Sequence, residues 1–329
     1  MDVTAELKQG RTVTRGNLES LIADVERQVS CPAEGVFGAD SLSWKINRES
    51  ALFLGAGRAS LLQLAHPWVA TALDQHSAVM AKPVERFHNT FRVVFTMIFG
   101  SFDQARRASR SLHDLHTRIR GRVPETVAGY PSGSAYEANA IPALRWVFAT
   151  LVESAVLAYE CALPPLTEQE RIAYYTEART LAKLFGIPGD ALPQDWSGFT
   201  EYIAAMFQSQ ELGVSDRARA MAHRLLAGSG SWVPIPRWYY ALTTELLPTR
   251  FVTEFSLRFE AAEKDLARRS RQWLSRIYPK LPSVFRFVGP YHEAQAHLAQ
   301  RSPGLLVRRS NRFWIGEVRL PFGEDGALQ

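Results

Sequence analysis

This chain has few cysteines: Cys31 and Cys161 are the two in its 329 residues. Two cysteines exclude a disulfide framework and a cysteine-based zinc finger, and they fit a reducing compartment. The first residues also lack the apolar core and small-residue cleavage site of a secretory signal. We therefore expect a cytoplasmic protein.

Long uninterrupted apolar runs are missing as well. The longest candidate, residues 146–163, contains Glu153 and Glu160, and each carboxylate is costly at the centre of a bilayer. We interpret this stretch as a core helix and expect no stable membrane insertion. The chain also lacks the Gly-x-Ser-x-Gly and P-loop sequences, which removes the most easily recognised hydrolases and nucleotide hydrolases.

The chain carries a small excess of positive charge. Apolar residues make up 46% of the chain and charged residues 22%, as in an ordinary soluble globular protein long enough to enclose a cofactor. The formal net charge is +5, and a basic run lies near the C-terminus, beside Phe313 and Trp314: Arg301, Arg308, Arg309 and Arg312. An anionic surface or nucleic acid has to be considered, but we favour a solvated basic face and expect no nucleic acid partner.

Helical periodicity is what the sequence contains in abundance, whereas regular runs of β-branched residues are missing. The predicted fold class is all-α, with one multi-helix domain over residues 46–300, a capping region over 1–45 and a basic tail over 301–329. We predict helices over residues 18–29, 49–79 with a break at His66-Pro67, 83–99, 102–121, 143–162, 167–185, 197–210, 215–227, 236–247 and 254–278. Residues 305–320 are predicted to include a short extended segment.

His116 is the histidine that periodicity places most firmly on a buried helix face. Over residues 102–121 one apolar stripe has spacings of three and four: Phe102, Ala105, Ala108, Leu112, Leu115, His116 and Ile119. A buried neutral imidazole needs a partner for each nitrogen, or it binds a metal. His113 lies at the edge of the same stripe.

Two other patterns resemble known motifs only weakly. Gly55-Ala-Gly57-Arg58-Ala-Ser60 is similar to a dinucleotide-binding turn, but no strand-helix-strand alternation follows, so we favour a tight helix-packing role. Glu85-x-x-His88 matches half of a di-iron carboxylate site. No second Glu-x-x-His exists, and a surface contact is favoured.

The predicted helix that starts at Pro83 has a polar face beside an aromatic one. Arg86 and Thr90 are four residues apart and share a face, and Phe87 and Phe91 adjoin it. Such a pair suits a pocket that holds an anion or a polarised oxygen, although a surface arginine with a back-bonding threonine is equally compatible. His66 precedes Pro67, where the helix must kink, and kinks often border a cavity; we keep it as a candidate cofactor-lining residue and favour a structural role.

Several motifs, taken in order, resemble one family. They are residues 57–67 (Gly-Arg-Ala-Ser-Leu-Leu-Gln-Leu-Ala-His-Pro), Asp74-x-His76-Ser77, Arg86-x-x-x-Thr90, Phe99-Gly100, Leu112-His113-x-x-His116 with Gly121, and residues 146–154 (Trp-Val-Phe-Ala-Thr-Leu-Val-Glu-Ser). Over about residues 48–250 the chain resembles the catalytic domain of rubber oxygenases (latex-clearing proteins) and MpaB-type oxygenases.

This resemblance implies an all-α, globin-like core that carries a b-type haem, with His116 as the proximal iron ligand and His113 nearby. It also implies a distal face with Arg86, Asn89 and Thr90 as the candidate catalytic residues, where Arg86 stabilises negative charge as O₂ or a peroxide reacts.

The chain departs from the family pattern at two positions. Asn89 stands where rubber oxygenases have a lysine that can act as a sixth ligand, and Phe148 stands where smaller members have a histidine. We therefore expect a haem-dependent oxygenase that acts on a small hydrophobic intracellular substrate rather than on polyisoprene. A haem carrier without turnover, or a metal-free helical protein in which His116 is a satisfied core residue, are the alternatives. Self-association into a homo-oligomer stays open.

Overall fold

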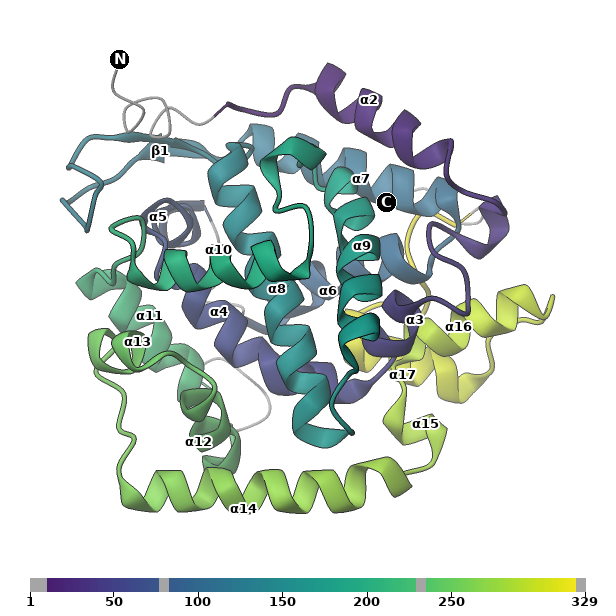
Figure 1. The fold of residues 1–329 in the computed structure, drawn as a ribbon. Helices are drawn as coiled ribbons and strands as arrows, with labels where there is room; N and C mark the ends of the chain where they lie inside the picture. Colours follow the sequence, from purple (N-terminus) through teal and green to yellow (C-terminus); the bar gives the residue numbers. More distant parts are fainter. Residues whose placement is uncertain (1–10, 77–82, 229–234, 324–329) are drawn as a thin grey trace.

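Helices form most of the chain in the computed structural model, which describes residues 11–76, 83–228 and 235–323 (Figure 1). The helices of the first half are α2 (Arg15–Glu26), η1 (Pro32–Glu34), α3 (Leu42–Asn47), η2 (Ser50–Gly55), α4 (Ala56–Leu64), α5 (Pro67–His76), α6 (Pro83–Phe99), α7 (Phe102–Thr117) and α8 (Ile141–Ala162). Those of the second half are α9 (Glu168–Leu184), η4 (Gly189–Ala191), α10 (Trp196–Gln208), α11 (Asp216–Leu226), α12 (Arg237–Glu245), α13 (Thr249–Glu254), α14 (Ala261–Ile277), η5 (Tyr278–Lys280), α15 (Ser283–Arg286), α16 (Gly289–Leu298) and α17 (Leu305–Ile315). The prediction of a mainly α-helical fold is confirmed.

Several predicted helix boundaries are close to the observed ones. The helix over residues 83–99 agrees at both ends, and α9 begins with the expected capping box between Thr167 and Glu170. The larger differences are that α2 spans Arg15–Glu26 instead of 18–29, that residues 254–278 include the end of α13 and all of α14 instead of one helix, and that the helix predicted to reach Gly121 ends at Thr117. Ser77 and residues 78–79 of the predicted 49–79 helix lie outside the described residues.

The predicted extended segment near the C-terminus is also wrong. Residues 305–315 form the helix α17, which ends at Gly316 in the left-handed conformation (φ 73°). Asn311 and Ile315 are buried, and α17 packs against α6 and α16. The spacing of Val307, Phe313, Ile315 and Val318 favours an extended segment, whereas burial of one helical face decided the outcome.

A short hairpin is the sheet that the described residues form, and the sequence did not predict it. Strands β1 (Arg120–Arg122) and β2 (Ala135–Glu137) pair antiparallel, with Gly121 opposite Tyr136. Three residues a strand are too few to produce a recognisable alternation. The hairpin connects the end of α7 to the start of α8.

Helix α8 forms the centre of the core. It packs against α3, α4, α9, α14 and η2, and most of its residues are buried. By length and composition α8 is the one helix among the described residues that could span a membrane, but 67% of its most apolar window is buried inside the protein. Its carboxylates pair with arginines: Glu153 with Arg58 and Glu160 with Arg171.

The glycines of the Gly55-Ala-Gly57 motif serve close packing. Residues 50–55 form the 3₁₀ helix η2 rather than a strand, so the dinucleotide-binding interpretation lacks its first element. A Cβ atom on Gly55 would lie 2.5 Å from the Ser154 carbonyl oxygen on α8, and one on Gly57 would lie 2.7 Å from the Thr243 hydroxyl on α12. The motif therefore lets η2 and α4 approach α8 and α12.

Helices α6 and α7 form a helical hairpin. Gly100 and Ser101 connect them, and Ser101 starts α7 through a capping box with Gln104. All of residues 95–100 are buried, whereas none of residues 84–94 is; on α7 none of residues 110–117 is buried. The hairpin is thus closed at its turn and accessible at residues 84–94 and 110–117, which we call the open end.

Candidate functional site

His116 lies in the last turn of α7, at the open end. Its side chain is partly accessible, and the neighbouring Leu115 is 53% exposed. The predicted apolar stripe is therefore correct for Phe102, Ala105 and Ala108, which are buried, and wrong for Leu115. The reason is tertiary: α2, α6 and α9 contact α7, but they leave Leu115 uncovered.

The electrostatic environment keeps the His116 imidazole neutral. Burial lowers the pKa of His116 to about 4, and electrostatic interactions with His113 and Arg86 add to this effect. A hydrogen bond with Asn139 acts weakly in the opposite direction. The His116 side chain is thus largely desolvated, although part of it is accessible.

Arg86 lies on the facing part of α6. It is about as far before the Gly100-Ser101 connection as His116 is after it, and its effect on the pKa of His116 indicates that the two groups are close. Desolvation lowers the pKa of Arg86 itself to about 10, so the guanidinium is charged at neutral pH. A neutral imidazole and a guanidinium therefore face the same open end.

Asn89 and Thr90 follow Arg86 on α6, and both are exposed. The accessible part of α6 also presents aromatic rings. Phe87 and Phe91 are partly buried and lie 4.7 Å apart between ring centroids. Behind them Phe53 packs on both rings and stacks on Trp314 of α17 at 4.1 Å.

This arrangement supplies an apolar wall beside the polar groups of α6. Leu62 on helix α4 is fully buried in the core and does not reach an accessible surface.

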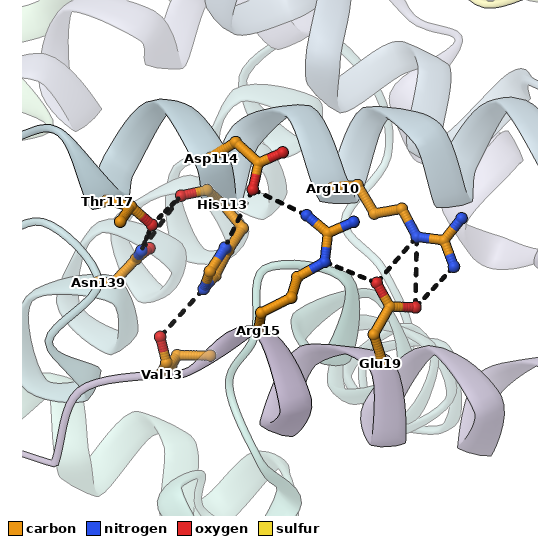
Figure 2. A network of polar contacts seen from close by, with 8 residues as sticks. All are labelled: Val13, Arg15, Glu19, Arg110, His113, Asp114, Thr117 and Asn139. Atoms are coloured by element: carbon orange, nitrogen blue, oxygen red, sulfur yellow. Dashed lines mark hydrogen bonds and ion pairs between the residues drawn. The ribbon is translucent and has the colours of Figure 1, made fainter.

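His113 points toward the N-terminal segment (Figure 2). Its Nε2 donates to the Val13 carbonyl at 3.0 Å, and its Nδ1 lies 3.6 Å from the Asp114 carboxylate. The side chain is nearly buried, and Nδ1 has no hydrogen-bond partner. His113 therefore ties α7 to residue 13 and contributes a polar group beside His116.

Asn139 is the residue of the site that sequence reasoning missed. It is buried between β2 and α8, and its Nδ2 donates to the His113 carbonyl at 3.2 Å and to the Thr117 hydroxyl at 3.1 Å (Figure 2). It thus fixes the last turn of α7 on both sides of His116. A loop asparagine has no periodic signal, and only the tertiary contact identifies it.

Helix α2 holds the outer side of α7 through ion pairs (Figure 2). Arg15 contacts Asp114 at 2.7 Å, and Glu19 accepts from both Arg15 and Arg110. The hydrogen bond from Arg110, followed by that from Arg15, lowers the pKa of Glu19. The predicted capping region is thus attached directly to the helix that carries His116.

His66 lies between α4 and α5 and is fully buried. Its Nδ1 accepts from the Trp68 backbone N–H at 3.3 Å, and its Nε2 has no partner. A neutral imidazole whose Nδ1 accepts carries its proton on Nε2, which then has no lone pair for a metal. The ring packs against Trp68 and Tyr130, so the geometry favours the structural role.

The Glu85-x-x-His88 pair lies on the outer surface of α6. His88 Nε2 is 3.0 Å from the Phe313 carbonyl on α17, and Glu85 is exposed. Among the described residues no three His, Cys, Asp or Glu side chains are close enough to hold a metal ion. A histidine such as His116 can be the one protein ligand of a metal that brings other ligands of its own, such as a metal macrocycle.

A separate cavity of about 280 Å³ lies between residues 11–21 and the start of α8. Its wall includes Arg11 and Asp190, two well-exposed residues that pair at 3.6 Å. Neither His116 nor Arg86 lines it. This cavity is a surface cleft beneath the N-terminal segment, and the open end remains the better candidate site.

The fold and the site define a class of protein: an all-α domain in which a helical hairpin carries a histidine and an arginine near enough to interact electrostatically. Residues 44–277 match the family described as ER-bound oxygenase mpaB/B'/Rubber oxygenase, catalytic domain, and the chain belongs to this family. The match confirms the resemblance seen in the sequence and supports an oxygenase-type enzyme. Neither the curated proteins nor the solved structures gave a significant match.

Proposed function

We propose that the open end holds a b-type haem, which the protein uses for an oxygenase reaction. The observation that carries the proposal is the pairing of a neutral imidazole, His116, with a desolvated guanidinium, Arg86, on adjacent helices. A single histidine is a common protein ligand of haem iron. When bound, haem supplies a redox-active iron that reacts with O₂ or a peroxide.

Asn139 prepares His116 for this role. Both amide hydrogens of Asn139 are directed to groups of α7, the His113 carbonyl and the Thr117 hydroxyl. Its Oδ1 is then the atom left to accept from the His116 ring. An imidazole that donates one N–H carries a lone pair on the other nitrogen, which is the form that binds a metal.

The residues of α6 would act on the reacting molecules. Arg86 stabilises negative charge that develops on the oxidant, because a fixed guanidinium in a desolvated site needs little reorganisation. Asn89 and Thr90 are exposed on the same helix and donate or accept hydrogen bonds there.

The substrate we propose is a small hydrophobic molecule. Support comes from the aromatic rings of Phe87 and Phe91 and from the exposed Leu115, which line the accessible parts of α6 and α7. Both cysteines are free, with Cys161 buried and Cys31 exposed. A reducing compartment such as the cytoplasm suits an exposed free thiol.

Haem binding is tested by titrating the purified protein with haemin and recording the absorption spectrum. We expect a Soret band of a histidine-ligated haem in the wild type and in His297→Ala, whose side chain is exposed and lies on α16. His116→Ala should lose that band and bind haem about 100-fold more weakly. A featureless wild-type spectrum, or an unchanged spectrum in His116→Ala, contradicts the proposal.

Turnover separates an enzyme from a haem carrier. With haem-loaded protein, O₂ consumption is measured with a panel of unsaturated hydrocarbons and lipids, and then with hydrogen peroxide as the oxidant. Arg86→Met should keep the haem spectrum and lower the rate by about 10²-fold. A normal ligand-binding spectrum without turnover on any member of the panel would favour the carrier.

A further inference from the structure

The charges of this chain are distributed unevenly along its length. Residues 266–316 contain ten Lys and Arg residues and a single acidic one, Glu293, leaving 28 basic against 32 acidic residues elsewhere. Glu293 is buried, so it adds no negative charge to the surface. The segment covers most of α14 and all of α15, α16 and α17, which lie along the lower and right-hand sides of the molecule (Figure 1).

Large apolar side chains are exposed within the same segment. Five of them fall in 13 residues, at the place where α14 is followed by η5 and α15: Trp273, Ile277, Leu281, Val284 and Phe285. Trp273 is 54% exposed and Phe285 71%. Trp273 and Ile277 are four residues apart and share a face of α14. We call this group of side chains the α14–α15 corner.

The cations of the corner differ in their ion pairing from the other cations of α14. On α14, Arg268 and Arg269 pair with Asp265, and Arg271 pairs with Glu245. Arg276 and Lys280, which alternate with the apolar residues of the corner, have no carboxylate within 4.0 Å in the described parts of the chain. The corner therefore combines apolar side chains with unneutralised positive charge.

The combination of exposed apolar side chains and positive charge fits some kinds of binding partner better than others. In a symmetric dimer formed through this corner, Arg276 and Lys280 would lie against the same cations of the second copy, which is unfavourable. Nucleic acid would leave the aliphatic side chains of Ile277 and Leu281 without a partner, and it would gain no stacking from Trp314, which is already stacked on Phe53. An anionic lipid surface accommodates both components, because aromatic and aliphatic side chains enter the boundary of the acyl chains and Lys and Arg contact the headgroups.

We propose that the α14–α15 corner docks peripherally on membranes that contain anionic phospholipid. Trp273 and Phe285 enter the headgroup region, while Arg276 and Lys280 bind lipid phosphates or carboxylates. The contact is made by the surface of the folded protein, and α8 stays in the core. This docking is independent of whether haem is bound.

Co-sedimentation of the full-length protein with lipid vesicles tests the proposal. We expect binding to vesicles of phosphatidylcholine and phosphatidylserine in about a 7:3 ratio, and much weaker binding to phosphatidylcholine alone or at about 0.5 M salt. Trp273→Ser/Phe285→Ser should weaken binding about 100-fold, and Arg276→Gln/Lys280→Gln about 30-fold.

Matched controls remove the same chemistry elsewhere. Leu305→Ser/Leu306→Ser takes two exposed apolar side chains from α17, and Arg11→Gln/Arg27→Gln takes two exposed charges from the N-terminal region on the opposite side in Figure 1. Both controls should bind like the wild type. Circular dichroism verifies that each variant is folded, and light scattering reports the oligomeric state.

Three results would overturn the proposal. The first is no binding of the wild type to the anionic vesicles, and the second is equal losses in the corner variants and the controls. The third is a wild-type dimer that becomes a monomer in Trp273→Ser/Phe285→Ser, because the corner would then be a protein interface.

Discussion

Replacement of Arg58 by methionine tests the interpretation of the glycine-rich motif as a packing element. Arg58 is 2% exposed, and its guanidinium donates to the Leu246 carbonyl at 2.7 Å, the Ser154 hydroxyl at 2.9 Å and the Glu153 carboxylate at 2.8 Å. These contacts join α4 to α8 and to the end of α12. A methionine keeps much of the aliphatic volume and removes all three donors.

The expected loss follows from what the substitution leaves behind. Breaking a buried ion pair costs about 3–5 kcal/mol, because the remaining charge has no partner. Glu153 is 21% exposed, so water can hydrate part of its carboxylate. We therefore expect the lower end, about 3 kcal/mol. At about 2 °C per kcal/mol for a chain of this length, the melting temperature falls by about 6 °C.

Differential scanning calorimetry measures the loss, with Arg171→Met as the matched control. Arg171 pairs with Glu160, also on α8, but both side chains are partly exposed, so its loss should be below about 1 kcal/mol. Equal losses in Arg58→Met and Arg171→Met would refute the assigned role of the buried pair. A large change in dinucleotide binding without a change in melting temperature would restore the cofactor-binding interpretation.

Three further predictions concern packing, pH and the proposed site. Gly55→Ala should destabilise the fold by about 2 kcal/mol through the clash with the Ser154 carbonyl. Gly16→Ala in α2, where a Cβ atom would meet only the Thr14 hydroxyl at 3.9 Å, should be neutral or stabilising, and equal effects of the two substitutions would contradict the packing argument. Burial lowers the pKa of His66 to about 4, so the stability that its neutral form contributes is complete above about pH 6.5 and is lost as the pH falls toward 4. The loss can reach about 3 kcal/mol, and His66→Phe should reduce it when the free energy of unfolding is measured in urea at pH 7 and pH 4.5. An identical pH dependence of the two proteins would be the contrary result. Asn139→Leu should weaken haem binding 10-fold to 100-fold and shift the iron–histidine stretching frequency, while an unchanged affinity and frequency would limit Asn139 to a structural role.

The local sequence was sufficient to predict the ends of a helix where one face of that helix had to be buried. The limits of α6 were predicted because Pro83 starts the helix and Phe95, Ile98 and Phe99 face the core at its end. The capping box at Thr167 predicted the start of α9 for a similarly local reason. Neither prediction needed a distant contact.

Side-chain periodicity failed where distant parts of the chain decided the outcome. Leu115 continues the apolar stripe of α7, yet it is exposed, because coverage depends on which helices pack there. The direction of His113 depends on Val13, 100 residues away in sequence, and that distance leaves no periodic signal. Residues 305–320 were assigned an extended segment because packing of α17 against α6 and α16 is not visible locally.

The sequence by itself determined the helical class of this protein, its family resemblance and the candidate residues His116, Arg86, Asn89 and Thr90, since helix formation and motif order are properties of short segments. The tertiary structure decided that Arg86 and His116 face the same accessible end of a hairpin and that Asn139 fixes the turn beside the imidazole. It also decided that Arg276 and Lys280 have no carboxylate within 4.0 Å among the residues that the structure describes. Those facts depend on contacts between residues far apart in the chain, and only folding brings them together.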